Sequence, residues 1–314
     1  MSAVFAFLFP GQGSQAVGML HDLADASPLV RETFTEASDV LGLDLWRLVE
    51  EGPKDELDRT ENTQPAMLAA GIAVWRVWRA SDGPAPQALA GHSLGEYSAL
   101  VAAGALEFSE AVAVVAERGR LMQAAVPAGT GAMAALIGAA DADVIALCEA
   151  QAQGEVLEAV NFNAPGQVVI AGARTAIERA AAAAKDAGAK GVVMLPVSVP
   201  SHSSLMRPAA ERLAERLADV ALAPPQIPIL HNASVASEAE PARIRELLVR
   251  QLFSPVRWVE TAQRLAADGA ELAIECGPGR VLAGLGKRID KRFKTLPVFD
   301  PATLATALEA ANAA

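Results

Sequence analysis

The chain has 314 residues, of which 52% are apolar, and carries a formal net charge of −11. This length suggests one large domain or a large domain with a smaller insert, and the apolar content is sufficient for a sizeable core. The acidic balance opposes a whole-surface attraction to nucleic acid or anionic membrane, so we expect neither as a partner, and an acidic partner would need a local basic patch.

The cysteines and the N-terminal residues predict neither a metal site nor a targeting segment. Cys148 and Cys276 are far apart and lack metal-ligand spacing, which favours two core thiols and no bound metal. The apolar run before Pro10 is short and has no basic lead, as expected for a first strand rather than a signal peptide. No apolar run approaches the roughly 18 to 20 residues that span a bilayer, so we expect a soluble, cytoplasmic protein.

Strand-like apolar runs that precede helical sequence occur near both ends of the chain. They cover residues 4–9, 87–91, 271–276 and 295–299, and helix-forming sequence follows each of them. Strands that alternate with helices predict a mostly parallel sheet with helices on both faces.

The middle of the chain has a different order of elements. It reads strand, helix, strand, strand, helix, strand over residues 131–138, 141–152, 156–162, 166–172, 174–187 and 191–198. This βαββαβ order is typical of ferredoxin-like folds. We therefore expect an α/β fold in which a large domain, residues 1–127 and 200–314, carries a ferredoxin-like insert at 128–199, with the ligand site in the cleft between them.

A nucleophile-elbow motif follows the second predicted strand. Residues 91–95 read Gly-His-Ser-Leu-Gly and precede a helix predicted at 94–103. In that setting the motif presents a serine hydroxyl at a helix N-terminus, and its glycines remove side chains that would collide with neighbouring backbone. Ser93 is therefore the candidate nucleophile, and the alternative is a chance match in a glycine-rich turn.

A serine nucleophile needs a base, and the chain has four histidines. His92 adjoins the serine and should point away from it, and His21 lies in an early helical region with no special setting. His202 lies at the hinge where the chain re-enters the large domain, whereas His231 follows a strand-like run at 227–230. Position alone favours His202 but leaves His231 open.

Two backbone amides could stabilise the oxyanion of an acyl intermediate. The Leu94 amide follows the serine, and the Gln12 amide lies in a glycine-flanked loop after the first strand, where glycines permit close approach. The Gln12 loop could instead be a plain tight turn or a phosphate cradle. It lacks the Gly-x-Gly-x-x-Gly pattern, however, and the chain has no Walker motif, so nucleotide binding is weakly supported.

An arginine is predicted on the apolar face of a helix at 109–125. Its spacing from Val114 and Met122 places Arg118 on that face. A guanidinium keeps its charge when buried and therefore needs an anion. The residues leave two anions open, the carboxylate of a substrate and a protein carboxylate in a structural ion pair.

Six segments of the chain together resemble the malonyl-CoA:acyl carrier protein transacylases of bacterial fatty acid synthesis. They are residues 9–15, 91–98, 118–119, 161–163, 200–202 and 275–279. The resemblance covers nearly the whole chain and implies an α/β-hydrolase-like large domain with a ferredoxin-like insert, which agrees with the predicted order of elements.

The resemblance also implies the roles of the site residues. Ser93 would be the nucleophile, His202 the base and Arg118 the clamp on the free malonyl carboxylate. The remaining roles would fall to the oxyanion-hole amides of Gln12 and Leu94, the main-chain carbonyl of Gln251 that orients the histidine, and the substrate-binding residues Met122, Asn161 and Asn163. His231 would be a bystander, and Leu94 and Ser201 would lie near the acyl α-carbon.

The implied reaction has two stages and needs no cofactor. Ser93 attacks malonyl-CoA, and the phosphopantetheine thiol of the partner, acyl carrier protein, then takes the malonyl group from the serine ester. Carrier proteins are acidic, so the most basic stretch of the chain is a candidate docking surface. It contains Arg280, Lys287, Arg288, Lys291, Arg292 and Lys294. The alternative for these residues is a solvated helix face.

Three other functions stay open. The first is a serine hydrolase or thioesterase in which water replaces the carrier thiol, although an inward Arg118 has no use in a hydrolase of neutral esters. The second is a malonyl transferase that serves polyketide synthesis. The third is an idle scaffold that binds acyl carriers, against which the intact Ser93 and His202 argue.

Overall fold

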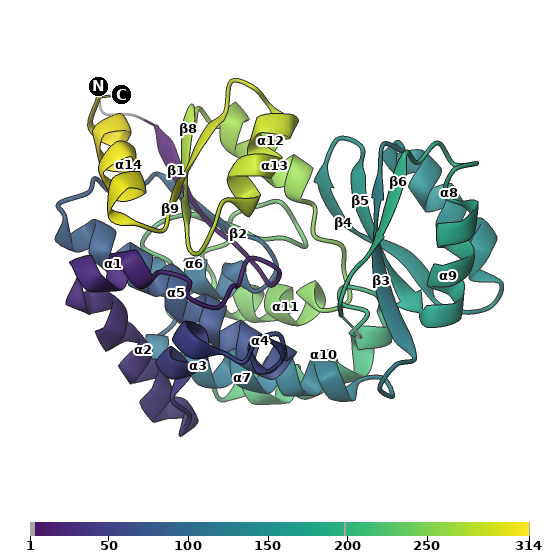
Figure 1. The fold of residues 1–314 in the computed structure, drawn as a ribbon, viewed down its shortest axis with the longest axis horizontal. Coiled ribbons are helices and arrows are strands. Elements are labelled where there is room, and N and C mark those ends of the chain that lie inside the picture. The colour runs from purple at the N-terminus through teal and green to yellow at the C-terminus, as the bar shows by residue number, and fades with distance from the viewer. Residues whose placement is uncertain (1–3, 198, 314) are drawn as a thin grey trace.

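The structure is a computed structural model that describes residues 4–197 and 199–313. It contains a five-stranded parallel sheet and a separate four-stranded antiparallel sheet, which lie beside each other (Figure 1). The predicted α/β class is therefore confirmed. No helix within these ranges is long and apolar enough to cross a membrane.

The parallel sheet has the order β7-β2-β1-β8-β9. In its central strand the rings of Phe5, Phe7 and Phe9 pack on one face, while Ala6 and Leu8 pack on the other, and all five are buried. Burial on both faces explains why this strand reads as an uninterrupted apolar run. The strands are β1 (Phe5–Phe9), β2 (Ala88–Gly91), β7 (Ile229–Leu230), β8 (Leu272–Cys276) and β9 (Lys294–Val298).

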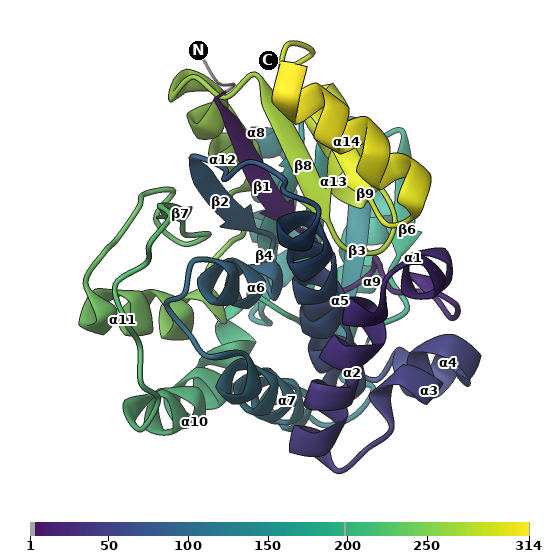
Figure 2. The same cartoon turned by 90° about the vertical axis from the view of Figure 1, so that its left-hand side faces the viewer.

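Helices cover both faces of the parallel sheet (Figure 2). The long α5 and the short α6 pack on the phenylalanine face of β1, whereas α12 and α13 pack on the opposite face. These four helices are α5 (Thr60–Ala80), α6 (Gly95–Ala102), α12 (Trp258–Ala267) and α13 (Val281–Ile289). The others outside the second sheet are α1 (His21–Ala26), α2 (Pro28–Leu41), α3 (Leu45–Glu51), α4 (Lys54–Leu57), α7 (Phe108–Ala124), α10 (Arg207–Ala218), α11 (Pro241–Gln251), α14 (Pro301–Ala313) and the 3₁₀ turn η1 (Ser204–Met206).

The antiparallel sheet has the order β4-β5-β3-β6, with α8 and α9 on one face (Figure 1). Its elements are β3 (Gly131–Ile137), α8 (Asp141–Ala152), β4 (Leu157–Ala164), β5 (Gln167–Ala173), α9 (Arg174–Ala183) and β6 (Gly191–Met194). The sequence of elements is the predicted βαββαβ order.

Two elements of this sheet are shorter than predicted. The strand expected at 191–198 ends at Met194, because Pro196 lacks the N–H that would continue the ladder, and residue 198 lies outside the described residues. The helix expected at 174–187 ends at Ala183 and gives way to turns.

One edge of the small sheet is joined to the large domain. The Phe162 amide donates to the Val256 carbonyl at 3.0 Å, and the Val256 amide donates to the Val160 carbonyl at 2.8 Å. Val256 precedes α12, so the β4 edge is fixed to the helices that cover the parallel sheet. The domain boundaries at 128–199 stay a prediction, but this joint holds the two sheets in a fixed relation around the site described next.

Candidate active site

Ser93 lies in the tight turn between β2 and α6, with a φ of 52°. A Cβ atom on Gly91 would lie 1.9 Å from the Gly95 carbonyl carbon, and one on Gly95 would lie 2.0 Å from the Phe9 carbonyl oxygen. Only glycine fits at either position. The turn is the predicted nucleophile elbow, and its left-handed serine is a form of backbone strain often found at functional sites.

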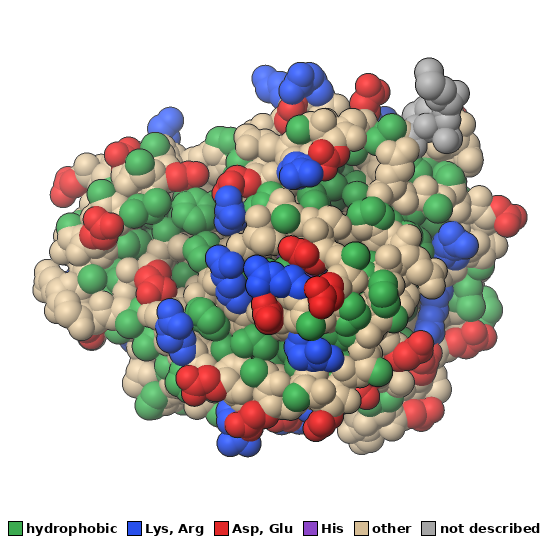
Figure 3. Space-filling view, turned by 180° about the vertical axis from the view of Figure 1, so that it is seen from behind, with side chains coloured by type: hydrophobic (Ala, Val, Ile, Leu, Met, Phe, Trp, Pro, Cys, Tyr) green, Lys and Arg blue, Asp and Glu red, His purple; other side chains and the backbone are tan. Residues whose placement is uncertain are grey.

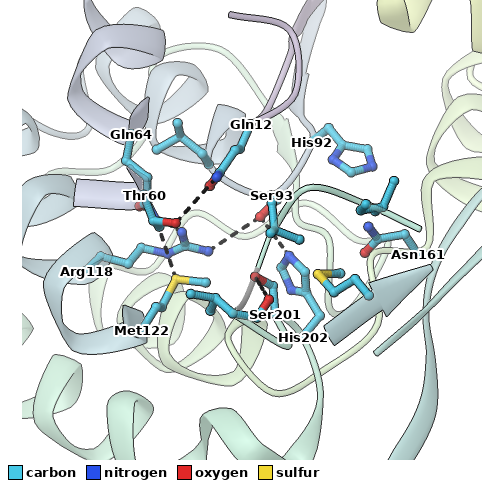
Figure 4. Close-up of a pocket in the computed structure, with 15 residues that line it drawn as sticks. Gln12, Thr60, Gln64, His92, Ser93, Arg118, Met122, Asn161, Ser201 and His202 are labelled. Atoms are coloured by element: carbon cyan, nitrogen blue, oxygen red, sulfur yellow. Dashed lines mark hydrogen bonds between the residues drawn. The ribbon is translucent and has the colours of Figure 1, made fainter. Parts of the chain in front are cut away.

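His202 is the histidine that contacts the serine hydroxyl. Its Nε2 lies 2.7 Å from Ser93 Oγ (Figure 4). Its Nδ1 lies 2.8 Å from the Gln251 carbonyl oxygen. A carbonyl oxygen can only accept, so Nδ1 carries a proton and Nε2 presents its lone pair to the hydroxyl. Ser93, His202 and the Gln251 carbonyl are thus connected by two successive hydrogen bonds.

The environment of His202 disfavours the charged ring. Burial, and then the positive charge of Arg118, lower the pKa of His202 to about 3. The imidazole is therefore neutral near pH 7 and able to accept a proton from the serine. A protonated ring becomes favourable only when negative charge develops beside it, as it does in a tetrahedral acyl intermediate.

Two backbone amides beside the serine have no partner. Gln12 and Leu94 both line the cavity, and within residues 4–197 and 199–313 neither N–H finds an acceptor. A Cβ atom on Gly11 would lie 2.6 Å from the His92 carbonyl oxygen, so glycine lets the Gln12 loop pack directly against the elbow. The Leu94 amide also stands at the N-terminus of α6, where the helix dipole favours negative charge. This arrangement can stabilise an oxyanion.

Arg118 is 1% exposed and points into the cavity from α7 (Figure 4). Its Nη1 donates to Gln64 Oε1 at 2.8 Å and its Nη2 to Gln251 Oε1 at 2.9 Å, and Nη2 lies 3.5 Å from Ser93 Oγ. Both amide oxygens are neutral, and none of the ion pairs among the described residues includes Arg118. Of the two partners left open by the sequence, a direct ion pair with a protein carboxylate is not formed among the described residues. The charge is available to a ligand.

The cavity has a volume of about 100 Å³. Met122, Asn161 and Ser201 line it, and their contact with a substrate stays a prediction. Asn163 does not line it, because this side chain stands behind the wall with its Oδ1 2.8 Å from His92 Nε2. The prediction that Asn163 faces the substrate therefore lacks support from the geometry.

The residues that hold the elbow from behind were missed by the sequence analysis. Asn232 accepts from the Ser93 amide at 2.6 Å and donates to the Gly91 carbonyl at 2.6 Å. His231 contacts the Glu96 carboxylate at 2.7 Å instead of the serine hydroxyl. The sequence did contain a feature that could have indicated Asn232. This residue comes two positions after β7, a parallel strand that neighbours β2, and the carboxyl ends of such strands meet at ligand sites.

Two further polar side chains line the cavity. Gln64, which binds Arg118, and Thr60, which accepts from the Gln12 side chain at 3.4 Å, come from the first two turns of α5. No motif in that helix indicated them.

Within the described ranges, no group of three or more His, Cys, Asp or Glu side chains could hold a metal ion.

The elbow, the histidine and the two-sheet fold together define an acyl-transfer enzyme. The chain matches the acyl transferase domain family over residues 6–298 and belongs to that family. It is 54% identical over 305 residues to the malonyl CoA-acyl carrier protein transacylase of Escherichia coli strain K12, which covers 97% of this chain and 99% of that protein. It is 46% identical to the protein of the same name from Bacillus subtilis strain 168, over 306 residues that are 97% of this chain and 96% of that protein.

Solved structures agree over the same length. The malonyl CoA-acyl carrier protein transacylase of Coxiella burnetii superposes with a TM-score of 0.98 at 49% identity and covers 99% of both chains. A malonyl-transacylase in complex with its type II PKS acyl-carrier protein superposes with a TM-score of 0.97 at 54% identity, which covers 98% of this chain and 100% of that chain. The family resemblance noted from the sequence is therefore confirmed.

Proposed function

We propose that this protein transfers the malonyl group of malonyl-CoA to the phosphopantetheine thiol of holo acyl carrier protein, through an ester on Ser93, and so supplies malonyl carrier protein for fatty acid synthesis. One observation carries the choice of acyl group. A buried arginine that makes no direct ion pair with a described carboxylate lies 3.5 Å from the serine hydroxyl. The names of the relatives from Escherichia coli and Bacillus subtilis support the same donor and acceptor.

In the first stage the serine becomes acylated. His202 Nε2 accepts the hydroxyl proton while Ser93 Oγ attacks the thioester carbonyl carbon, and the carbonyl oxygen takes the negative charge. The Gln12 and Leu94 amides donate to this oxyanion, which is a contribution of about 10²-fold or more for each donor. The C–S bond then breaks, and the CoA sulfur leaves with the proton from His202.

In the second stage the carrier thiol reverses these steps. Its proton passes to His202, its sulfur attacks the malonyl ester, and the C–O bond to Ser93 breaks as the serine recovers the proton. Arg118 binds the free carboxylate of the acyl group through two parallel hydrogen bonds. Leu94 and Ser201, which both line the cavity, lie near the acyl α-carbon, and Met122 and Asn161 contact the acyl chain.

Carrier docking is assigned to the basic residues of the α13 segment. Arg280, Lys287 and Lys291 are exposed, and no ion pair or hydrogen bond occupies their charged groups within the described structure. Arg292 instead pairs with Asp290 at 2.8 Å, and Arg288 is bonded to the Gln167 side chain. The face seen from behind in Figure 3 carries basic side chains with acidic ones interspersed among them.

A polyketide carrier is a second candidate acceptor. It is favoured by the 54% identity to a malonyl-transacylase solved with a type II PKS acyl-carrier protein. Because the carrier's thiol reacts in the same way in both pathways, the site geometry does not distinguish them. The rate of discharge onto holo carriers of each kind does.

The decisive measurement is the intact mass of the protein after a brief incubation with malonyl-CoA, followed by addition of holo acyl carrier protein. Wild type should gain the mass of one malonyl group and lose it to the carrier. Ser93→Ala should show no mass gain, because Ser93 is the described hydroxyl that contacts the base His202. An adduct that water removes equally fast with or without carrier would support a thioesterase instead.

A further inference from the structure

A buried carboxylate lies directly behind the elbow, outside the cavity. Glu96 is fully buried in the first turn of α6. Its Oε1 lies 2.7 Å from His231 Nδ1, and its Oε2 accepts from the Asn232 amide at 3.0 Å and from Gln251 Nε2 at 2.8 Å. Two N–H groups donate to Oε2, and His231 Nδ1 donates to Oε1 in the tautomer that carries its proton on that nitrogen. These are the surroundings of an ionised carboxylate.

The amide of Gln251 can adopt only one orientation between Glu96 and the active site. Its Nε2 donates to the Ser93 carbonyl at 3.0 Å and to the Glu96 carboxylate, while its Oε1 accepts from Arg118 Nη2 at 2.9 Å. A flipped amide would place its oxygen against two acceptors and its NH₂ group against a donor. The side chain therefore links the carboxylate to the guanidinium in a fixed sense.

This link keeps two opposite buried charges close together but out of contact. A direct ion pair would satisfy Arg118 and leave no charge for a ligand, whereas a buried charge with no counter-ion at all is costly. Burial lowers the pKa of Arg118, and the negative charge of Glu96 acts in the opposite direction. The ring of Tyr97 lies 5.6 Å from the guanidinium carbon and adds a further favourable contact.

We propose that Glu96 is the buried counter-ion of Arg118, held one glutamine side chain away, so that the arginine stays charged but unpaired and can bind an acyl carboxylate. Glu96 and the Gln251 side chain are then positioning residues and do not touch the substrate. The proposal rests on the proposed function, in which Arg118 receives the malonyl carboxylate.

A negative charge placed in contact with Arg118 should destroy the preference for malonyl-CoA over acetyl-CoA. Gln64→Glu puts a carboxylate where a neutral oxygen now accepts from Arg118 Nη1, and its only other loss is a weak 3.4 Å contact with the Met122 sulfur. We expect the ratio of kcat/KM for malonyl-CoA to that for acetyl-CoA to fall about tenfold or more, mainly through KM for malonyl-CoA. Gln64→Leu is the matched control, which loses the same hydrogen bond without adding charge and should lower the ratio much less.

Removing the charge of Glu96 should instead lower stability and leave the preference for malonyl-CoA intact. Glu96→Gln keeps the shape and an acceptor oxygen but leaves Arg118 without its counter-ion. We expect the melting temperature to fall by about 5 °C while the malonyl to acetyl ratio is retained or raised. In an Arg118→Gln background the same substitution should cost markedly less, because the charge that it stabilises is gone.

The outcomes separate the two proposals. The counter-ion role would be overturned if Glu96→Gln lowered the melting temperature equally in the wild-type and Arg118→Gln backgrounds. It would also be overturned if Glu96→Gln lowered the malonyl to acetyl ratio of kcat/KM as far as Gln64→Glu does. If Glu96→Gln is too unstable to purify, purification of the double variant with Arg118→Gln supports the coupling, and failure of both overturns it. A malonyl to acetyl ratio that Arg118→Ala leaves unchanged would instead remove the carboxylate clamp of the proposed function.

Discussion

The two sides of the nucleophile elbow differ in how their polar groups are matched. On the cavity side, and among the residues that the structure describes, the Gln12 and Leu94 amides have no acceptor, and Arg118 donates to neutral oxygens without contacting a carboxylate. On the far side, Glu96 and Asn232 make short hydrogen bonds to neighbouring groups. Because unsatisfied buried polar groups are costly, the free donors of the cavity side favour a ligand that accepts from them, whereas the far side holds a strained turn in place.

The two buried histidines show the same difference. His202 and His231 both lie beside the elbow and are at most 3% exposed. His202 presents Nε2 to the serine hydroxyl, whereas His231 presents Nδ1 to a carboxylate. The partner of each ring, rather than its burial or its place after a strand, distinguishes a candidate base from a structural histidine.

The largest effect that would sharpen this comparison is expected for His202→Asn. Without the imidazole no group accepts the serine proton, so kcat for malonyl transfer should fall about 10³-fold or more. His231→Asn is the matched control on the far side. It should retain most of the transfer rate and mainly lower the melting temperature. Equal losses of kcat in the two variants would break the distinction between the two sides.

Asn232→Ala tests whether the far side holds the elbow. It removes the acceptor of the Ser93 amide and the donor to the Gly91 carbonyl, so the free energy of unfolding should fall by about 2–3 kcal/mol. We expect kcat to fall about 10- to 100-fold, since the serine is then less firmly placed. Asn232→Asp keeps the acceptor but sets a carboxylate oxygen against the Gly91 carbonyl and close to Glu96, so it should be at least as unstable as Asn232→Ala in urea denaturation. Unfolding curves that coincide with that of wild type would show that the turn needs no such support.

The sequence indicated the polar groups nearest the serine on the cavity side, but not Gln64 and Thr60 of the cavity wall and little of the far side. Ser93, His202 and Arg118 were predictable because each stands in a local pattern, an elbow motif, a hinge or a helix face. The resemblance supplied the Gln251 carbonyl. The contacts among Glu96, Asn232 and the Gln251 side chain join segments more than 130 residues apart, and no local periodicity records such pairings.

The fold shows the same limit. The order of strands and helices followed from apolar runs and turn residues, including the ferredoxin-like insert. Element ends did not, since the strand expected at 191–198 stops at Met194. Asn163 belongs to a segment matched by the resemblance, yet its side chain bonds to His92 and does not line the cavity.

The pH dependence of acyl transfer tests the low pKa of His202 on the cavity side. Since burial and the Arg118 charge lower the pKa of His202 to about 3, the base stays neutral, and kcat/KM with acetyl-CoA should be flat between about pH 7 and 5. Arg118→Gln removes one of these causes, so the pKa of His202 should rise and the acid limb should move toward neutral pH by about one unit. Identical acid limbs in the two proteins would contradict this electrostatic coupling.

The same shift in the pKa of His202 makes folding stability depend on pH. The unfolded chain binds a proton on this ring below about pH 6.5, whereas the folded protein does so only near pH 3. Stability is therefore lost as the pH falls through this interval. We expect the melting temperature of wild type to drop more between about pH 7 and 5 than that of His202→Asn. A larger drop in the variant would contradict the neutral, buried ring.

The smallest effect is expected far from both sides of the elbow, at the candidate docking surface. Lys287→Glu combined with Lys291→Glu should raise KM for holo acyl carrier protein by a few-fold to about tenfold at low salt, because exposed charges steer an acidic partner without touching the reacting atoms. The rate of Ser93 acylation by malonyl-CoA alone should not change. Arg292→Glu is the control, since its charge is already paired with Asp290. The difference between the double variant and wild type should vanish as salt is raised, and a salt-independent loss would place these lysines in the structure of α13 rather than in carrier docking.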